Sequence, residues 1–257
     1  MALTIAGSDS GGGAGIQADL KTFASLGVHG TTAITCITAQ NPRRVTGIQA
    51  CRPEIVRQQI EAVFSELSPA AVKTGMLYST EIIRVVSTFF KGRRRPPLVV
   101  DPVMVSTSGT RLLKPSAVKA LETGLLPLAT LVTPNLDEAA WLLGRPLHTP
   151  EDLRAAAREM HRRYGCAALV KGGHLRNMRE ALDFFYDGRD ELLLSAPFAR
   201  HISTHGTGCT YSAAITGYLA AGRSLVDAVQ AGKRYVTRAI HGSYRAGNHH
   251  AINHFHG

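Results

Sequence analysis

Short apolar segments alternate with helix-like segments along most of this 257-residue chain. The clearest of them, residues 98–103, begins with a continuous apolar run and then meets Asp101. Such a run is typical of a parallel strand that is covered on both faces. No linker, repeat or low-complexity stretch interrupts the alternation, and 44% hydrophobic content is enough for a large core. The pattern predicts an α/β protein with a mainly parallel central sheet flanked by helices, in a single domain over residues 1–257.

Hydrophobic periodicity and turn signals place the individual elements. Strands are expected at residues 3–7, 31–38, 71–77, 98–103 and 167–170, with a hairpin over residues 183–195. Residues 131–138 are expected to form a strand, a turn and the start of a helix. Helices are expected at residues 16–26, 53–67, 80–90, 115–125, 150–164 and 225–240. Open α/β sheets bind ligands beyond the carboxyl ends of their strands. Asp101 is therefore expected at a ligand-binding edge, with a simple capping role as the alternative.

A glycine-rich turn precedes a run of small and apolar residues that predicts a buried helix up to residue 221. Gly206 and Gly208 flank Thr207 just before Cys209. Glycines let backbone N–H groups converge on one point, and a helix N-terminus adds partial positive charge. The turn therefore predicts a site for an anion, with a phosphate in transfer as its ligand. A thiol at the head of a helix also loses its proton more easily. Spacing alone leaves open an ordinary turn before a core helix with an inert cysteine.

Composition and charge narrow the class of protein. The formal net charge is +10, but the basic residues are scattered apart from the cluster at residues 91–95, which no aromatic residue interleaves. We interpret that cluster as a solvated loop rather than a nucleic-acid patch. No apolar run approaches the roughly 18 residues of a membrane span, and no basic region precedes residue 5. The four cysteines lack zinc-site spacing. We expect a cytoplasmic protein with no nucleic-acid or membrane partner.

The chain does not fit two common nucleotide-binding motifs. The segment at residues 13–18 follows a strand and opens a helix, as the dinucleotide fingerprint does. That fingerprint also needs an acidic residue about 20 positions further on, and the next strand instead runs into Gln40, Asn41 and Pro42. The chain also lacks the phosphate-binding loop motif G-x-x-x-x-G-K-[ST].

Five segments, in order, resemble the hydroxymethylpyrimidine/phosphomethylpyrimidine kinases of thiamine biosynthesis, within the ribokinase-like superfamily. They are the opening at residues 6–19, Asp-Pro-Val at 101–103, Asn-x-x-Glu at 135–138, Lys-Gly-Gly-His at 171–174 and Gly-Thr-Gly-Cys at 206–209. The resemblance covers nearly the whole chain. It implies a three-layer ribokinase-like fold and ATP-dependent phosphorylation of 4-amino-5-hydroxymethyl-2-methylpyrimidine. It also implies a second transfer, to the monophosphate, which gives the diphosphate used for thiamine.

The resemblance implies a pyrimidine pocket lined by Gly7, Asp19, Gln40, Met76 and Val103. An amide side chain such as that of Gln40 offers both a donor and an acceptor to an aminopyrimidine edge. From the residues alone, the alternatives are a helix-surface carboxylate at Asp19, a strand-end polar residue at Gln40 and a core-filling Met76. A polar loop at residues 106–109 resembles the family's lid over the substrate.

A second set of residues is implied for phosphate and metal. Asp101 and Glu138 would hold Mg²⁺, Asn135 and Thr207 would contact ATP, and Lys171 would add a point charge. The spacing of Asn135 and Glu138 equally suits a helix capping box, and Lys171 could be a surface lysine before a turn.

The remaining roles belong to the glycine turn. The amides around Gly206 and Gly208 would hold the γ-phosphoryl group, and Cys209 would accept or relay the proton of the substrate hydroxyl. Phosphoryl transfer needs little base help, so an orienting role for Cys209 stays open.

Some positions depart from the family pattern, and other readings stay open. Residues 41–45 carry Arg43 and Arg44 where a different sequence is usual, and residues 201–203 also differ.

The closest alternative function is that of a pyridoxal kinase on the same scaffold. A more distant alternative is a pyrimidine-binding regulator without catalysis. We expect a homodimer and assign no metal to the histidine-rich tail. Activation by a monovalent cation is left open.

Overall fold

The computed structural model describes residues 1–92, 95–105, 112–113, 115–173, 175, 178–199 and 205–255. Nine strands form one sheet in the order β3-β2-β1-β4-β5-β6-β7-β8-β9. The six strands from β2 to β7 in this order are parallel, whereas β3, β8 and β9 pair antiparallel at the two edges. The strands are β1 (Ala2–Asp9), β2 (Gly30–Asn41), β3 (Arg44–Ala50), β4 (Ala71–Thr74), β5 (Leu98–Val100), β6 (Leu131–Val132), β7 (Ala167–Lys171), β8 (Glu180–Tyr186) and β9 (Glu191–Pro197).

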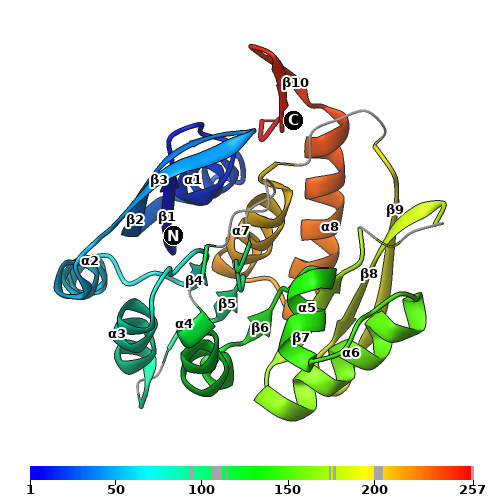
Figure 1. The fold of residues 1–257 in the computed structure, drawn as a ribbon, viewed down its shortest axis with the longest axis horizontal. Coiled ribbons are helices and arrows are strands. Elements are labelled where there is room, and N and C mark those ends of the chain that lie inside the picture. Colours follow the sequence, from blue (N-terminus) through cyan, green and yellow to red (C-terminus); the bar gives the residue numbers. More distant parts are fainter. Residues whose placement is uncertain are drawn as a thin grey trace.

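Helices cover both faces of this sheet, which confirms the expected α/β layering (Figure 1). One face packs against α1 (Gly15–Ser25), α7 (Thr207–Ala220) and α8 (Leu225–His241). The other face packs against α2 (Pro53–Glu66), α3 (Thr80–Phe90), α4 (Pro115–Ala120), α5 (Leu136–Leu143) and α6 (Pro150–Tyr164). The short inner strands β4 to β7 are almost entirely buried, because helices lie over both of their faces.

Strands β4 and β5 each end three residues earlier than expected, and three further elements differ from the sequence expectations. The helix expected at residues 115–125 continues beyond α4 as a π-helical turn, Leu121–Leu125, and is followed by a 3-10 turn, Leu126–Leu128. Strand β3 and the small tail hairpin of β10 (Tyr244–Ala246) and β11 (His249–Ala251) were not expected. Both are largely exposed, so they bury too little apolar surface to leave a clear alternating pattern.

Several expectations concern residues outside the described part of the chain. These are the lid at 106–109, the departure at 201–203, His174, and Arg93 and Arg94 within the basic cluster. None of the helices in the described ranges combines the length and the apolar character needed to cross a bilayer.

Candidate active site

A cavity of about 560 Å³ lies where the carboxyl ends of the parallel strands meet the first turn of α7. The topology explains why residues far apart in sequence gather there: several follow or end a parallel strand, parallel strands end at the same edge, and the start of α7 adds its own residues at that edge. The cavity is lined by ten of the residues that the sequence singled out, namely Gln40, Asp101, Val103, Asn135, Glu138, Lys171, Gly206, Thr207, Gly208 and Cys209.

The turn before α7 presents free hydrogen-bond donors to this cavity. Gly206 is the N-cap of the helix and has a left-handed backbone, with φ 83°. Within the described ranges, the backbone N–H groups of Thr207, Gly208 and Cys209 have no acceptor, and the buried hydroxyl of Thr207 has no partner either. Donors at a helix N-terminus favour a bound anion, so the geometry suits a phosphoryl group.

Lys171 and Asp101 lie beside this turn. Lys171 Nζ donates to Asp101 Oδ1 over 3.1 Å, and Thr133 and Ser212 donate to the same carboxylate over 3.2 and 3.1 Å. A Cβ built on Gly208 would lie 3.3 Å from Lys171 Nζ and 3.9 Å from Asp101 Oδ2. The ammonium group therefore lies next to the amides that would hold an anion.

The charges in this cluster fix its protonation states. Burial alone would raise the pKa of Asp101, but Lys171 and Lys73 outweigh burial and the net pKa is lowered. Burial alone would lower the pKa of Lys171, but Asp101 and Glu138 outweigh it and the net pKa is raised. Asp101 and Lys171 therefore form an ion pair at neutral pH.

Asn135 and Glu138 form the capping box of α5. The Asn135 side chain accepts from the Glu138 N–H, and Glu138 Oε2 accepts from the Asn135 N–H, each over 2.9 Å. Glu138 Oε1 also accepts from the Met104 N–H over 3.3 Å. The capping box that the spacing also suited is therefore present, and both residues still line the cavity. A helix cap and a ligand contact are compatible.

Asp101 and Glu138 also fit a magnesium ion held together with phosphates. Burial raises the pKa of Glu138 to about 7, an effect that Lys171 only partly offsets. The positive charge of Lys171 is not enough to offset the burial of this carboxylate. A bound divalent cation would add positive charge and stabilise the ionised form of Glu138. Mg²⁺ commonly takes one or two carboxylates, with substrate phosphates and water completing its shell. The donor set is therefore suitable.

Cys209 differs from the sequence expectation in its ionisation. Its position at the head of α7 was expected to make the thiol lose its proton more easily. Burial instead raises the pKa of Cys209 to about 11, with Lys73 opposing this rise and Asp19 adding to it. The desolvation cost of a thiolate is larger here than the help from the helix terminus. The thiol is protonated at neutral pH.

This ionisation state predicts slow alkylation of Cys209. A thiol with a pKa of about 11 is roughly a hundredfold less ionised at pH 8 than an ordinary cysteine, and the thiolate is the reactive form. We expect the rate of Cys209 alkylation by iodoacetamide to rise about tenfold per pH unit between pH 7 and pH 10. Peptide mass spectrometry would measure the rate at Cys209, with glutathione as the reference thiol. A rate similar to that of glutathione at pH 7 would contradict the raised pKa.

The residues expected to bind the pyrimidine ring do not all line the cavity. Gln40 and Val103 line the cavity. Gly7 and Met76 lie next to its wall, where a Cβ on Gly7 would be 2.7 Å from Cys36 Sγ and 3.5 Å from Met76 Sδ. Met76 is only 8% exposed and packs with Cys36 in a small apolar cluster. Ring contacts by Gly7 and Met76 stay predictions.

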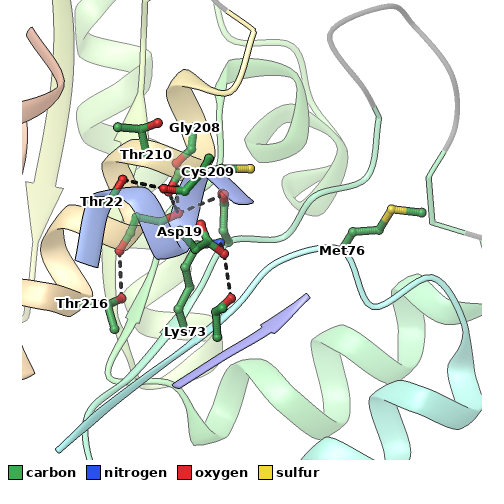
Figure 2. Close-up of polar contacts among 12 residues, drawn as sticks. Asp19, Thr22, Lys73, Met76, Gly208, Cys209, Thr210 and Thr216 are labelled. Atoms are coloured by element: carbon green, nitrogen blue, oxygen red, sulfur yellow. Dashed lines mark hydrogen bonds and ion pairs between the residues drawn. The ribbon is translucent and has the colours of Figure 1, made fainter. Parts of the chain in front are cut away.

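Asp19, which the resemblance places in contact with the ligand, is not among the residues that line the cavity, so that contact stays a prediction. Its side chain is fully buried, and Oδ2 accepts from Lys73 Nζ over 3.0 Å and from Thr4 Oγ1 over 2.6 Å. Figure 2 shows the Asp19–Lys73 pair beneath the first turn of α7, with Met76 well away from it. The side chain points into the protein because α1 turns this position toward β1 and β4. The spacing of residues in the sequence does not indicate that Asp19 pairs with Lys73.

Breaking this buried pair is expected to destabilise the fold. Lys73→Met leaves the Asp19 carboxylate buried without a counter-charge, which typically costs about 3–5 kcal/mol of unfolding free energy. The double variant Lys73→Met/Asp19→Asn removes both charges and should recover a large part of that loss. Urea unfolding of the wild type, Lys73→Met and the double variant measures the effect. A double variant as unstable as Lys73→Met would show that charge compensation is not the cause.

Sequence reasoning also missed the far end of the cavity. There α8 faces β8, and Lys233 Nζ donates to Asp183 Oδ2 over 2.7 Å and to the Ala181 carbonyl over 3.1 Å. Apolar residues of β9 and α8, such as Ala196 and Val236, line the same end. These residues line the same cavity as the turn before α7. They carry no local motif, so only the packing of α8 against the sheet reveals this end of the cavity.

The comparisons with known proteins agree with this geometry. The family model for phosphomethylpyrimidine kinase matches residues 9–254. A hydroxymethylpyrimidine/phosphomethylpyrimidine kinase of Rhizobium meliloti is 52% identical over 243 residues, which cover 93% of this chain and 90% of the relative. The structure of a phosphomethylpyrimidine kinase from Clostridium difficile is similar with a TM-score of 0.82 and 43% identity, covering 93% of this chain and 98% of that one. A pyridoxal kinase from Staphylococcus aureus, solved with AMP-PCP and pyridoxal, has a TM-score of 0.89 and 35% identity, covering 99% and 93%.

The layered sheet and the cavity at its carboxyl edge therefore define a kinase with a ribokinase-like fold. The chain belongs to the phosphomethylpyrimidine kinase family.

Proposed function

We propose that this protein transfers the γ-phosphoryl group of ATP to the hydroxymethyl group of 4-amino-5-hydroxymethyl-2-methylpyrimidine. We propose that it then phosphorylates the monophosphate, which gives the diphosphate used for thiamine. One observation carries the proposal: the free amides at the start of α7, the Lys171 ammonium and the Asp101 carboxylate converge on one cavity. Family membership supports the choice of substrate.

The donors at the start of α7 would hold the phosphoryl group in flight. Charge on its oxygens would be balanced by the N–H groups of residues 207–209 and by Lys171, which Asp101 keeps in place. Positioning and charge neutralisation supply most of the catalysis in phosphoryl transfer. Asn135 and Thr207 would contact the nucleotide phosphates, and Asp101 and Glu138 would hold Mg²⁺. When bound, that ion would withdraw charge from the phosphate oxygens.

Cys209 would mainly orient the acceptor hydroxyl. Its thiol carries its proton at neutral pH because burial raises its pKa to about 11. A loose transition state needs little help from a base, so transfer does not require a preformed thiolate. The thiol can accept a weak hydrogen bond from the hydroxyl until the phosphoryl group arrives.

Gln40 and Val103 would select the ring of the acceptor from the walls of the cavity. The second candidate is phosphorylation of pyridoxal, which the similarity to the pyridoxal kinase from Staphylococcus aureus favours. Gln40 supports the pyrimidine, because an amide matches an aminopyrimidine edge. A single domain over residues 1–257, a homodimer and a cytoplasmic location stay predictions.

A competition assay tests the proposal. The purified protein is given ATP, Mg²⁺ and equal concentrations of the hydroxymethylpyrimidine and pyridoxal, and the phosphorylated products are separated by chromatography. We expect the pyrimidine monophosphate first and the diphosphate after it. Excess pyridoxal phosphate would support the second candidate, and ATP consumption with neither product would overturn both.

A further inference from the structure

A nearly buried hydrogen bond joins the two ends of the candidate active site. His205 Nε2 lies 3.1 Å from Asp9 Oδ2, and the two side chains are 9% and 3% exposed. Asp9 is the last residue of β1, where the opening loop starts, and His205 directly precedes Gly206. The contact therefore connects the loop expected to bind the acceptor with the turn expected to bind the phosphoryl group.

The same Asp9 carboxylate shapes the opening loop. Oδ1 accepts from the Gly11 N–H over 2.8 Å, and Oδ2 accepts from the N–H groups of Gly13 and Ala14 over 3.1 and 2.8 Å. Burial alone would raise the pKa of Asp9, but the hydrogen bonds from His205, Gly11 and Ala14 outweigh it and the net pKa is lowered. One ionised carboxylate thus fixes both the path of the loop and the position of the histidine ring.

The loop and the turn are also in direct contact. A Cβ built on Gly206 would lie 1.8 Å from the Gly13 carbonyl oxygen, and a Cβ built on Gly13 would lie 2.7 Å from the His205 ring. Neither position has room for a side chain. The backbones of the two segments therefore touch in one register, and the bond between Asp9 and His205 holds them there.

We propose that Asp9 and His205 are positioning residues that set this register and thereby the rate of phosphoryl transfer. The inference rests on the proposed function. In-line transfer needs the acceptor oxygen about 3–3.5 Å from the phosphorus and aligned with it, and a 1 Å misplacement can cost about a hundredfold. The opening loop borders the cavity at Ala14 and holds the backbone of Gln40, the proposed acceptor contact, through Ser10, whereas the turn would hold the phosphoryl group. Their relative position, rather than the affinity of either segment for its ligand, depends on this pair.

The test compares His205→Leu with His205→Gln, whose amide nitrogen can take the place of the imidazole Nε2. We expect His205→Leu to lower kcat by about 30- to 100-fold, while the KM for the pyrimidine and for ATP changes less than about threefold. Misaligned γ-phosphate should also be lost to water, so more than one ADP should form per phosphorylated product. His205→Gln should restore most of the rate and the coupling. Trp141, the chain's only tryptophan, lines the cavity, and its fluorescence checks ATP binding.

Lys21→Met is the matched control. Lys21 Nζ donates to the Gly12 carbonyl over 2.8 Å, so it holds the same loop but does not reach the turn. We expect a change in kcat of less than about threefold and full coupling. A second check combines His205→Leu with Asp9→Asn. Two residues that act through one contact should be strongly non-additive, so the double variant should be about as slow as the slower single variant.

The possible outcomes distinguish failure of the proposed function from failure of the positioning role alone. A wild-type protein that phosphorylates neither the pyrimidine nor pyridoxal overturns the proposed function and, with it, the positioning role. A wild type that prefers pyridoxal shifts the comparison to that acceptor, with the same expected ratios. Wild-type rate and coupling in His205→Leu overturn the positioning role alone. So does an equal loss in Lys21→Met, because general loosening of the loop would then explain the result.

Discussion

Lys171→Met is expected to lower kcat for phosphoryl transfer by about a thousandfold, with a smaller change in the KM for ATP. Its ammonium group lies beside the α7 amides and is held 3.1 Å from Asp101. Charge that grows on the phosphoryl oxygens during transfer would lose its nearest cationic partner, and such losses cost about 10²–10³ in rate or more. Initial rates at varied ATP concentration give both constants.

The control for this variant is Lys91→Met, which makes the same chemical change at an exposed position near the end of α3. It should keep wild-type kinetics, because a solvated charge far from the cavity contributes little. Lys171→Arg adds information, since it keeps the charge but replaces a point charge with a planar group. A Lys171→Met enzyme within tenfold of wild-type kcat would remove Lys171 from the proposed transfer site.

Gly206→Ala is expected to reduce kcat/KM by at least about a hundredfold. Gly206 has φ 83°, a region that costs an L-residue about 1–2 kcal/mol, and its added Cβ would overlap the Gly13 carbonyl oxygen at 1.8 Å. Relief of that overlap requires the turn and the opening loop to separate. The amides of residues 207–209 would then move relative to the acceptor, and misplacement of this size strongly reduces transfer.

Gly222→Ala separates backbone strain from the clash. Gly222 has φ 85°, nearly the same backbone conformation, but a Cβ there would meet no atom within 4 Å. It should lower stability by about 1 kcal/mol and leave kcat/KM unchanged. Urea unfolding and initial rates distinguish the two effects. Equal activity losses in both glycine variants would mean that strain in the helix termini, rather than contact with the opening loop, controls the rate.

The residues proposed to bind phosphate were expected at one edge of the sheet and do line one cavity, because they lie at strand ends and at a helix start. Asp101 follows β5, Lys171 ends β7, and the turn at Gly206 opens α7. These positions are visible in a one-dimensional pattern, since apolar runs and glycines mark where elements begin and end. In a parallel sheet, the carboxyl ends of the strands lie at the same edge. Their convergence was therefore predictable.

The surroundings of Asp19 were not predicted, because side-chain direction decides them. Asp19 was expected to face the ligand, and its carboxylate pairs with Lys73 in the interior. Both residues look like ordinary surface positions in the sequence. A buried ion pair needs two partners from distant segments, and no spacing rule joins a helix residue to a strand residue 54 positions away.

The sequence by itself determined the α/β class, the residues at the strand ends and the glycine turn before α7, because local periodicity and residue type mark each of them. Tertiary structure alone decided that the Cys209 thiol is protonated, that Asp19 faces inward, and that Asp9 and His205 meet across 196 positions. Burial and long-range contact set pKa values and side-chain partners, and both exist only after the chain has folded.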